Sequence, residues 1–269
     1  MSDAWEWDPS LYSGSAEYYA RGRAGYPPEL AAAFAAELGL DGSGRLLDVG
    51  CGPGSLTLRL AGSFEEAVGL DADADMLGEA TRLAAEAGIR NCRWVRRRAE
   101  ELPAGLGRFR LVTFAQSFHW FDRARVAAAV RGMLEPGGAC AHVHATTHEG
   151  VEGSVPRAEI AELVRSYLGS VRRAGQGTLP EGTAAGESEI YRAAGFRGPR
   201  RFEVPGRDVT RTADDVVAGV FSLSSAAPHL FGDRRAEFEA ELRALLHRAS
   251  PGGTFTERLR EIAVDLWLP

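Results

Sequence analysis

Short apolar runs alternate with segments of helical periodicity through the first half of the chain. The runs are rich in Val, Leu and Phe, as buried strands are, and they occupy residues 45–50, 66–71, 92–95, 109–115 and 139–145. The amphipathic segments between them lie at residues 55–63, 76–88 and 122–134. Two further alternating segments follow, at residues 200–204 and 260–268. This order predicts an α/β fold with a doubly wound, mainly parallel seven-stranded sheet.

The rhythm changes after about residue 150, where helical patterns dominate. We expect one domain over residues 1–269, with an N-terminal helical cap at 1–40, a ligand-binding core at 41–148 and a C-terminal part at 149–269. Within that part, residues 206–253 read as a helical insertion between the last two strands, and it would cover the edge where open α/β sheets bind ligands.

Two helices of this insertion carry apolar positions. In the helix predicted at 234–249, one stripe has helical spacing and consists of Phe238, Leu242, Leu245 and Leu246. We expect it to pack on the helix predicted at 213–224, which would leave Phe221 facing the ligand.

The composition and net charge of the chain argue against nucleic-acid and membrane partners. The chain is 45% hydrophobic and 25% charged with a formal net charge of −6, which describes a globular protein that repels a phosphate backbone. The three cysteines form no Cys-x-x-Cys pair, and no segment resembles a signal peptide or is apolar enough to span a bilayer. We expect a cytoplasmic monomer or homodimer without nucleic-acid or membrane partners. The absence of lysine suggests a GC-rich bacterial genome.

The glycine-rich stretch "LLDVGCGPGS" at residues 46–55 raises the question of its ligand. A dinucleotide fingerprint would place a third glycine at position 55, where this chain has Ser55, and a triphosphate loop would need a lysine. Asp48, just before the glycines, suits an ammonium group better than a pyrophosphate. The turn therefore favours a ligand with a cationic amino-acid tail.

Asp71 ends the second predicted strand, 21 residues after Gly50. A carboxylate at this separation can accept both ribose hydroxyls of an adenine nucleoside. A nicotinamide dinucleotide and a sulfonium nucleoside would share this feature.

At this point the chain resembles the class I S-adenosylmethionine-dependent methyltransferases of the small-molecule type, and is similar to the trans-aconitate methyltransferase-like group. Five segments occur in that family's order and spacing over residues 15–145: "LLDVGCGPG", "VGLDADADML", "RAEELP", "LVTFAQSFHWFD" and "MLEPGG". The resemblance implies a Rossmann-like methyltransferase fold with S-adenosylmethionine as cofactor.

The resemblance also implies roles for individual residues. The backbone at Gly50, Gly52 and Gly54 would approach the methionine and ribose, Asp48 would hold the amino group, and Asp71 would accept from the ribose.

For the adenine, Ala99 would donate its backbone N–H and Glu100 would accept from the exocyclic amine, although Glu100 could simply be exposed. Met76 would cover an adenine face or belong to the core.

The N-terminal stretch "YYARGRAGYPPEL" resembles a Tyr-x-x-x-Arg-x-x-Tyr-Pro motif of such enzymes. It would bring Tyr19 to the cofactor and Arg23 to the methionine carboxylate; the alternative is a surface arginine. The backbone carbonyl of Gln116 would accept from the amino group.

The segment "AQSFHWFD" carries the candidate catalytic chemistry. His119 could act as a general base or could only orient the cofactor. Trp120 and Phe121 would wall an apolar acceptor pocket, while Asp122 caps the next helix.

His142 and His144 alternate on one strand face. His144 could line the acceptor pocket, and we predict no metal site there because a clear carboxylate ligand set is lacking.

Together these features predict methyl transfer from S-adenosylmethionine to an oxygen, nitrogen or activated carbon of a small organic acceptor, for example in secondary metabolism. Three alternatives stay open: an NAD-dependent oxidoreductase, a relative that binds S-adenosylmethionine without transferring methyl, and a methyltransferase acting on proteins or peptides.

Overall fold

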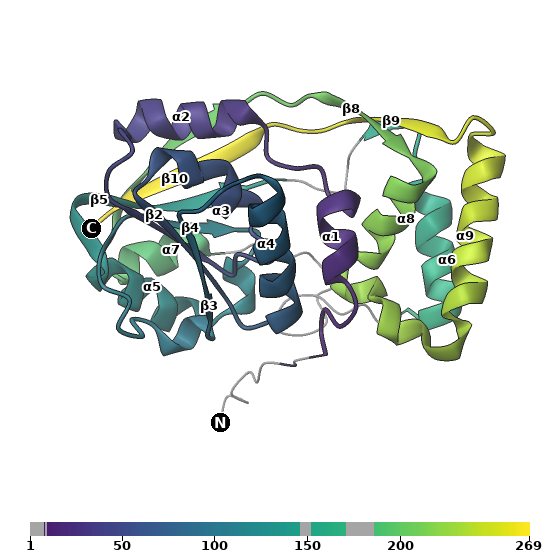
Figure 1. Ribbon diagram of the computed structural model, residues 1–269, viewed down its shortest axis with the longest axis horizontal. Helices are drawn as coiled ribbons and strands as arrows, with labels where there is room; N and C mark the ends of the chain where they lie inside the picture. Colours follow the sequence, from purple (N-terminus) through teal and green to yellow (C-terminus); the bar gives the residue numbers. More distant parts are fainter. Residues whose placement is uncertain (1–7, 9, 146–151, 171–185) are drawn as a thin grey trace.

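A seven-stranded sheet organises one side of the molecule in the computed structural model, which describes residues 8, 10–145, 152–170 and 186–269 (Figure 1). In spatial order its strands are β3 (Cys92–Arg96), β2 (Glu66–Asp71), β1 (Arg45–Val49), β4 (Phe109–Ala115), β5 (Leu134–His144), β10 (Ile262–Leu268) and β7 (Arg197–Val204). β10 runs antiparallel to both of its neighbours, β5 and β7, whereas the pairs among β3, β2, β1, β4 and β5 are parallel. The predicted fold class and all seven predicted strands are confirmed.

Helices cover both faces of this sheet because its central strands are buried on both sides. They are α2 (Pro28–Leu38), α3 (Ser55–Leu60), α4 (Ala74–Glu86), α5 (Arg123–Gly132) and α7 (Glu187–Ala193). Adjacent residues of β1 show the arrangement: Leu46 packs in a cluster with Leu30 and Phe34 of α2, whereas Leu47 packs in a cluster with Val126 of α5. Both leucines are 0% exposed, so the near-continuous apolar strands follow from two-sided burial.

Local sequence features set the helix ends. Asp73 accepts hydrogen bonds from the backbone N–H groups of Asp75 and Met76, which caps α4, and Asp122 accepts from Arg125 to cap α5. Gly88 follows α4 with a φ of 66°. The predicted cap at Asp122 is confirmed, and Asp73 and Gly88 are residue types typical of helix ends. Short 3-10 helices occur at Ala61–Ser63, Ala99–Glu101, Phe118–Trp120, Ser224–Ala226 and Pro228–Arg234.

A second lobe lies beside the sheet domain (Figure 1). It contains α6 (Arg157–Leu168), α8 (Ala213–Phe221), α9 (Arg235–Ala249) and a three-stranded sheet of β6 (Glu152–Gly153), β9 (Thr254–Arg258) and β8 (Asp208–Thr212). Between β7 and β10 the chain runs through β8, α8, α9 and β9. The strands of this small sheet were not predicted, because "DVTRT" and "TFTER" are polar segments that carry few apolar side chains.

The second lobe has its own aromatic core. Phe238, Leu242 and Leu246 of α9 are 0% exposed and cluster with α8, as predicted for this stripe. The prediction that Phe221 faces a ligand is wrong. Phe221 is also 0% exposed and contacts the rings of Tyr18, Phe231 and Phe238. Because α8 is buried around most of its circumference, its largest side chain enters the aromatic core.

The first helix, α1 (Ala16–Gly22), packs on the second lobe, and Figure 1 shows it between the two parts of the molecule. A Cβ added at Gly22 would lie 2.4 Å from the carbonyl carbon of Ala218 and 2.6 Å from the backbone nitrogen of Gly219 in α8. Arg211 donates from Nη2 to the carbonyl oxygen of Gly22 at 2.6 Å. Backbone therefore meets backbone between α1 and α8.

Replacing Gly22 tests this contact. Gly22→Val should lower the free energy of unfolding by about 1 to 3 kcal/mol, the usual cost of overpacking, measured by urea denaturation with circular dichroism. Gly78→Ala is the control, because a Cβ at Gly78 on the exposed side of α4 meets nothing within 4 Å. It should stabilise the protein by about 0.5 to 1 kcal/mol. Equal stability of Gly22→Val and the parent chain would contradict the close approach.

Candidate functional site

A cavity opens where the parallel strands β1, β2 and β4 end, and the turn after β1 forms one wall. Gly50 and Cys51 both donate their backbone N–H to the carbonyl oxygen of Leu70, at 2.8 and 3.1 Å. Gly50 has a φ of 68°, and a Cβ there would lie 2.6 Å from Ser117 Cβ and 2.8 Å from Phe121 Cζ. Both the backbone conformation and the neighbouring side chains therefore require glycine.

Asp71 connects the end of β2 to this turn. Its Oδ2 accepts from the backbone N–H of Gly52 at 2.8 Å, and its Oδ1 accepts from that of Asp73 at 2.9 Å. Burial raises the pKa of Asp71 to about 6. Each carboxylate oxygen carries a second lone pair, and Asp71 lines the cavity, so it can still accept hydrogen bonds from a ligand.

Asp48 lines the cavity but is only 1% exposed. Its two oxygens accept from the hydroxyls of Thr57 at 2.7 Å and Thr113 at 2.8 Å, and burial raises the pKa of its carboxyl. These bonds give Asp48 a structural role between β1, α3 and β4. Its contact with an amino group stays a prediction.

From the sequence, Gly54 is predicted to lie at the ligand, but the structure places it outside the cavity lining. A Cβ at this position would lie 2.6 Å from Cη2 of Trp94, and Gly54 is not among the cavity residues. Its glycine is required by packing of the turn against β3. By contrast, Gly52 lines the cavity, and a Cβ there would meet nothing within 4 Å.

The segment after β3 and the first turn of α4 form an adjacent wall. Ala99, Glu100 and Met76 all line the cavity and are 2%, 9% and 3% exposed. Glu100 accepts from the backbone N–H of Asp122 at 3.0 Å and lies 3.5 Å from Nε of Arg98. Glu100 is therefore buried and held in place, which rules out the alternative of an exposed side chain.

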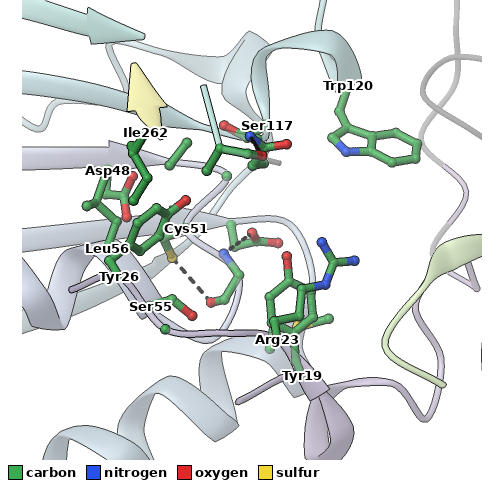
Figure 2. Close-up of a pocket in the computed structure, with 18 of the residues that line it drawn as sticks. Tyr19, Arg23, Tyr26, Asp48, Cys51, Ser55, Leu56, Ser117, Trp120 and Ile262 are labelled. Atoms are coloured by element: carbon green, nitrogen blue, oxygen red, sulfur yellow. Dashed lines mark hydrogen bonds between the residues drawn. The ribbon is translucent and has the colours of Figure 1, made fainter. Parts of the chain in front are cut away.

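Tyr19 and Arg23 enter from the N-terminal segment, and Figure 2 shows them on the side of the cavity away from Asp48. The guanidinium carbon of Arg23 lies 4.4 Å from the centroid of the Tyr19 ring. Arg23 donates to the hydroxyl of Ser222 at 3.3 Å and to its carbonyl oxygen at 3.1 Å. The predicted alternative of a surface arginine does not apply, because Arg23 is partly buried in the cavity wall.

The loop after β4 supplies aromatic walls. Trp120 and Phe121 line the cavity, and the ring of Trp120 contacts Tyr12 edge-on with centroids 5.9 Å apart. Gln116 also lines it, with a φ of 59° and its side-chain Nε2 donating to the carbonyl oxygen of Ala145 at 2.5 Å. A non-glycine residue with positive φ persists only where its surroundings hold it, and such residues cluster at functional sites.

His119 lies outside this cavity, contrary to its predicted place. It lines a neighbouring polar cavity with His142 and His144. Burial and, to a smaller extent, Arg123 lower the pKa of His119 to about 4. Because η3 (Phe118–Trp120) turns successive side chains in different directions, Trp120 faces the main cavity and His119 does not.

His144 is also separated from the main cavity. Its Nε2 lies 3.0 Å from Oδ2 of Asp265, which also pairs with Arg201, and its ring stacks on His142 at 4.4 Å. The substrate contact of His144 stays a prediction, because His144 lines the neighbouring polar cavity and not the cavity at the strand ends. Within the described residues, no group of three or more His, Cys, Asp and Glu side chains could hold a metal ion.

Several cavity residues were not predicted. They include Tyr12, Ser117, the crossing segment 205–207, Leu259, Arg260 and Ile262. Ser117 donates its hydroxyl to the carbonyl oxygen of Val49 at 2.6 Å, a contact that joins distant segments. Nothing in the local sequence marks these residues, since segments far apart in the chain bring them together at the strand ends.

The comparisons with known proteins bear on the turn and the strands around it. A family profile described as "Methyltransferase domain" matches residues 46–138. An uncharacterized methyltransferase of Mycobacterium tuberculosis is 37% identical over 133 residues, which are 49% of this chain and 51% of the relative. Residues 46–138 form a methyltransferase domain. The chain spans about half the length of this relative.

Solved structures extend the likeness of this methyltransferase domain to the whole fold. A structure from Anaeromyxobacter dehalogenans, provisionally named a type II methyltransferase, has a TM-score of 0.54 at 23% identity and covers 89% of this chain and 96% of its own. The YcgJ protein from Bacillus subtilis has a TM-score of 0.50 at 18% identity and covers 89% and 98%. Across the described part of the chain, helices that could cross a bilayer are absent.

The environment of His119 can be tested by its titration. With its pKa lowered to about 4, the ring should stay neutral between about pH 5.5 and pH 8, where an unperturbed imidazole titrates. The Cε1–H resonance of His119, assigned by comparison with His119→Gln in proton NMR spectra, should therefore hold a constant shift over this range. A midpoint near pH 6.5 would show that the ring is solvated or pairs with an acid.

Proposed function

We propose that the protein transfers a methyl group from S-adenosylmethionine to a small organic acceptor. One observation carries this proposal: in a methyltransferase domain, the carboxylate of Asp71 is fixed by Gly52 in the wall of the cavity at the strand ends. The names of the relatives support methyl transfer as the type of reaction.

The residues present fit this cofactor. Asp71 offers oxygens for the ribose hydroxyls, and the apolar side chain of Met76 lies beside Ala99 and Glu100, where an adenine would find an apolar face and an acceptor. The open space at Gly52 admits a ligand close to the backbone. When bound, S-adenosylmethionine supplies an electrophilic methyl group.

Arg23 and Tyr19 would hold the amino-acid end of the cofactor. The Arg23 guanidinium makes hydrogen bonds only to the neutral groups of Ser222 in the described structure, so a carboxylate would add its first charged partner there. The backbone carbonyl of Gln116 and the buried Asp48 would favour the amino group.

The second lobe would exclude water from the reacting centre. Trp120, Phe121 and Tyr12 add apolar wall to the cavity. The two segments that connect the sheet domain to the lobe also line it, with residues 205–207, Leu259, Arg260 and Ile262. Exclusion of water strengthens electrostatic contacts with a sulfonium and favours transfer of its methyl group. His119 is not assigned the role of base, because it lies outside the cavity and its pKa is lowered to about 4.

The pH dependence of cofactor binding tests Asp71. Because burial raises the pKa of Asp71 to about 6, lowering the pH from about 7.5 to about 5 protonates an acceptor, and the dissociation constant of S-adenosylhomocysteine should rise about tenfold by linkage. Isothermal titration calorimetry measures it, with NAD as a ligand expected not to bind. Asp71→Asn should bind more weakly at pH 7.5 and lose this dependence. NAD binding without S-adenosylhomocysteine binding would refute the proposed cofactor.

The carboxylate contact is tested by a ligand that lacks it. Arg23→Leu should weaken S-adenosylhomocysteine about tenfold, the order expected for a charge-assisted pair, but should change 5′-methylthioadenosine binding by less than about twofold. Arg21→Leu is the matched control, since Arg21 pairs with Asp214 and Asp215 at the surface. Equal losses for both ligands would mean that Arg23 shapes the cavity and does not bind the carboxylate.

A further inference from the structure

A second cavity lies within the second lobe, next to the proposed cofactor cavity. It encloses about 530 Å³ between α6, α8 and the strand β9, within the range of small-molecule sites. Arg23, Ala24 and Leu259 line both cavities. We call these three residues the junction.

The walls of the second cavity are mainly apolar. On α6, Ile160, Val164 and Leu168 follow each other at one-turn spacing and all line it, and Val216 and Val220 of α8 do the same. Two helices thus present apolar faces to one space. A ligand held there would need an apolar body.

The charged groups of this cavity gather near the junction. Glu257 precedes Leu259 by two residues in an extended segment, so both side chains lie on the same face. Arg157 forms an ion pair with Glu257, which is 6% exposed. The pair therefore stands beside Leu259.

Arg211 adds a buried cation at the same place. It is 8% exposed, and its Nη2 donates to the carbonyl oxygen of Gly22, the residue before Arg23. Among the described residues its Nε has no hydrogen-bond partner. Arg165 is the remaining guanidinium of the lining; it is about 12 Å further along α6 than Arg157 and pairs at the surface with Glu162.

The lining is therefore cationic and holds no available proton acceptor. Four arginines and a single carboxylate, that of Glu257, line the cavity, and this carboxylate is already paired with Arg157. The described residues that line the second cavity include neither His nor Cys. A neutral hydroxyl would find no general base there, whereas a nucleophile that is already an anion needs none.

We propose that this cavity binds the acceptor and that the acceptor is an amphipathic carboxylic acid methylated on its carboxylate at the junction. This inference rests on the proposed function. A carboxylate oxygen lone pair would form the new bond to the methyl carbon while the carbon–sulfur bond breaks and its electron pair stays on sulfur. The products are a neutral methyl ester and S-adenosylhomocysteine, and no proton moves.

The binding test uses three probes of equal chain length: octanoate, octan-1-ol and octylamine. In calorimetric titrations of the full chain saturated with S-adenosylhomocysteine, octanoate should bind at least about tenfold more tightly than the others, as a charge-assisted contact predicts. With S-adenosylmethionine, mass spectrometry should detect methyl octanoate. Val164→Trp should block octanoate without changing S-adenosylhomocysteine binding.

The ion pair between Arg157 and Glu257 gives a sharper test, because replacing its two members should change the affinity for octanoate in opposite directions. Arg157→Gln leaves the Glu257 charge unpaired and should weaken octanoate about tenfold, whereas Glu257→Gln frees a cation and should tighten it about threefold. Arg243→Gln is the control: it is an identical change outside the cavity lining, where Arg243 pairs with Asp214 and Glu239 at the surface, and it should alter binding by less than about twofold.

Three results would overturn the inference: equal or tighter binding of the alcohol or amine, similar losses in both ion-pair variants, or octanoate binding without ester formation. In each case normal S-adenosylhomocysteine binding would leave the proposed function standing. If the parent chain does not bind S-adenosylhomocysteine, the proposed function itself is refuted.

Discussion

The close approach of α1 to α8 is the contact on which the rest of the ligand region depends. Because Gly22 has no side chain, the backbones of the two helices are in contact. Arg211 donates a hydrogen bond to the carbonyl oxygen of Gly22, the last residue of α1. The chain must then leave α1 at Arg23, which lies between the two cavities. A larger spacing would move Arg23 away from Ser222 and open the wall between the cavities.

A second constraint acts inside the sheet domain. The backbone N–H groups of the glycine turn donate to the carbonyl oxygen of Leu70 and to the carboxylate of Asp71, both in β2. The turn follows β1, so β1 and β2 position it together. Ser117 then packs over Gly50 and donates to Val49, which ties the loop after β4 to the same strand. Three neighbouring strands therefore fix one turn, and a rigid turn is what a ligand bound through backbone contacts needs.

The sheet domain could be predicted because its information is local. Buried strands, Asp73 and Asp122 as caps, and the glycine turn each follow from a few adjacent residues. The directions of the Phe221 and His119 side chains do not follow from adjacent residues. Phe221 packs against Phe231 and Phe238 in the aromatic core of the second lobe. The short helix η3 directs His119 away from the main cavity. The polar strands of the second lobe were missed for the same reason, since they are stabilised by pairing and not by their own apolar pattern.

The strand order also dictates when parts of the protein can fold. β7 hydrogen-bonds to the large sheet only through β10, which lies between β5 and β7. During synthesis β7 and β8–β9 leave the ribosome before β10, so β7 has no place in the sheet until the last strand arrives. The loop closed by β7 and β10 carries α8 and α9, and a contact so distant in sequence is slow to form. Completion of the sheet and closure of the ligand region are therefore one late folding event.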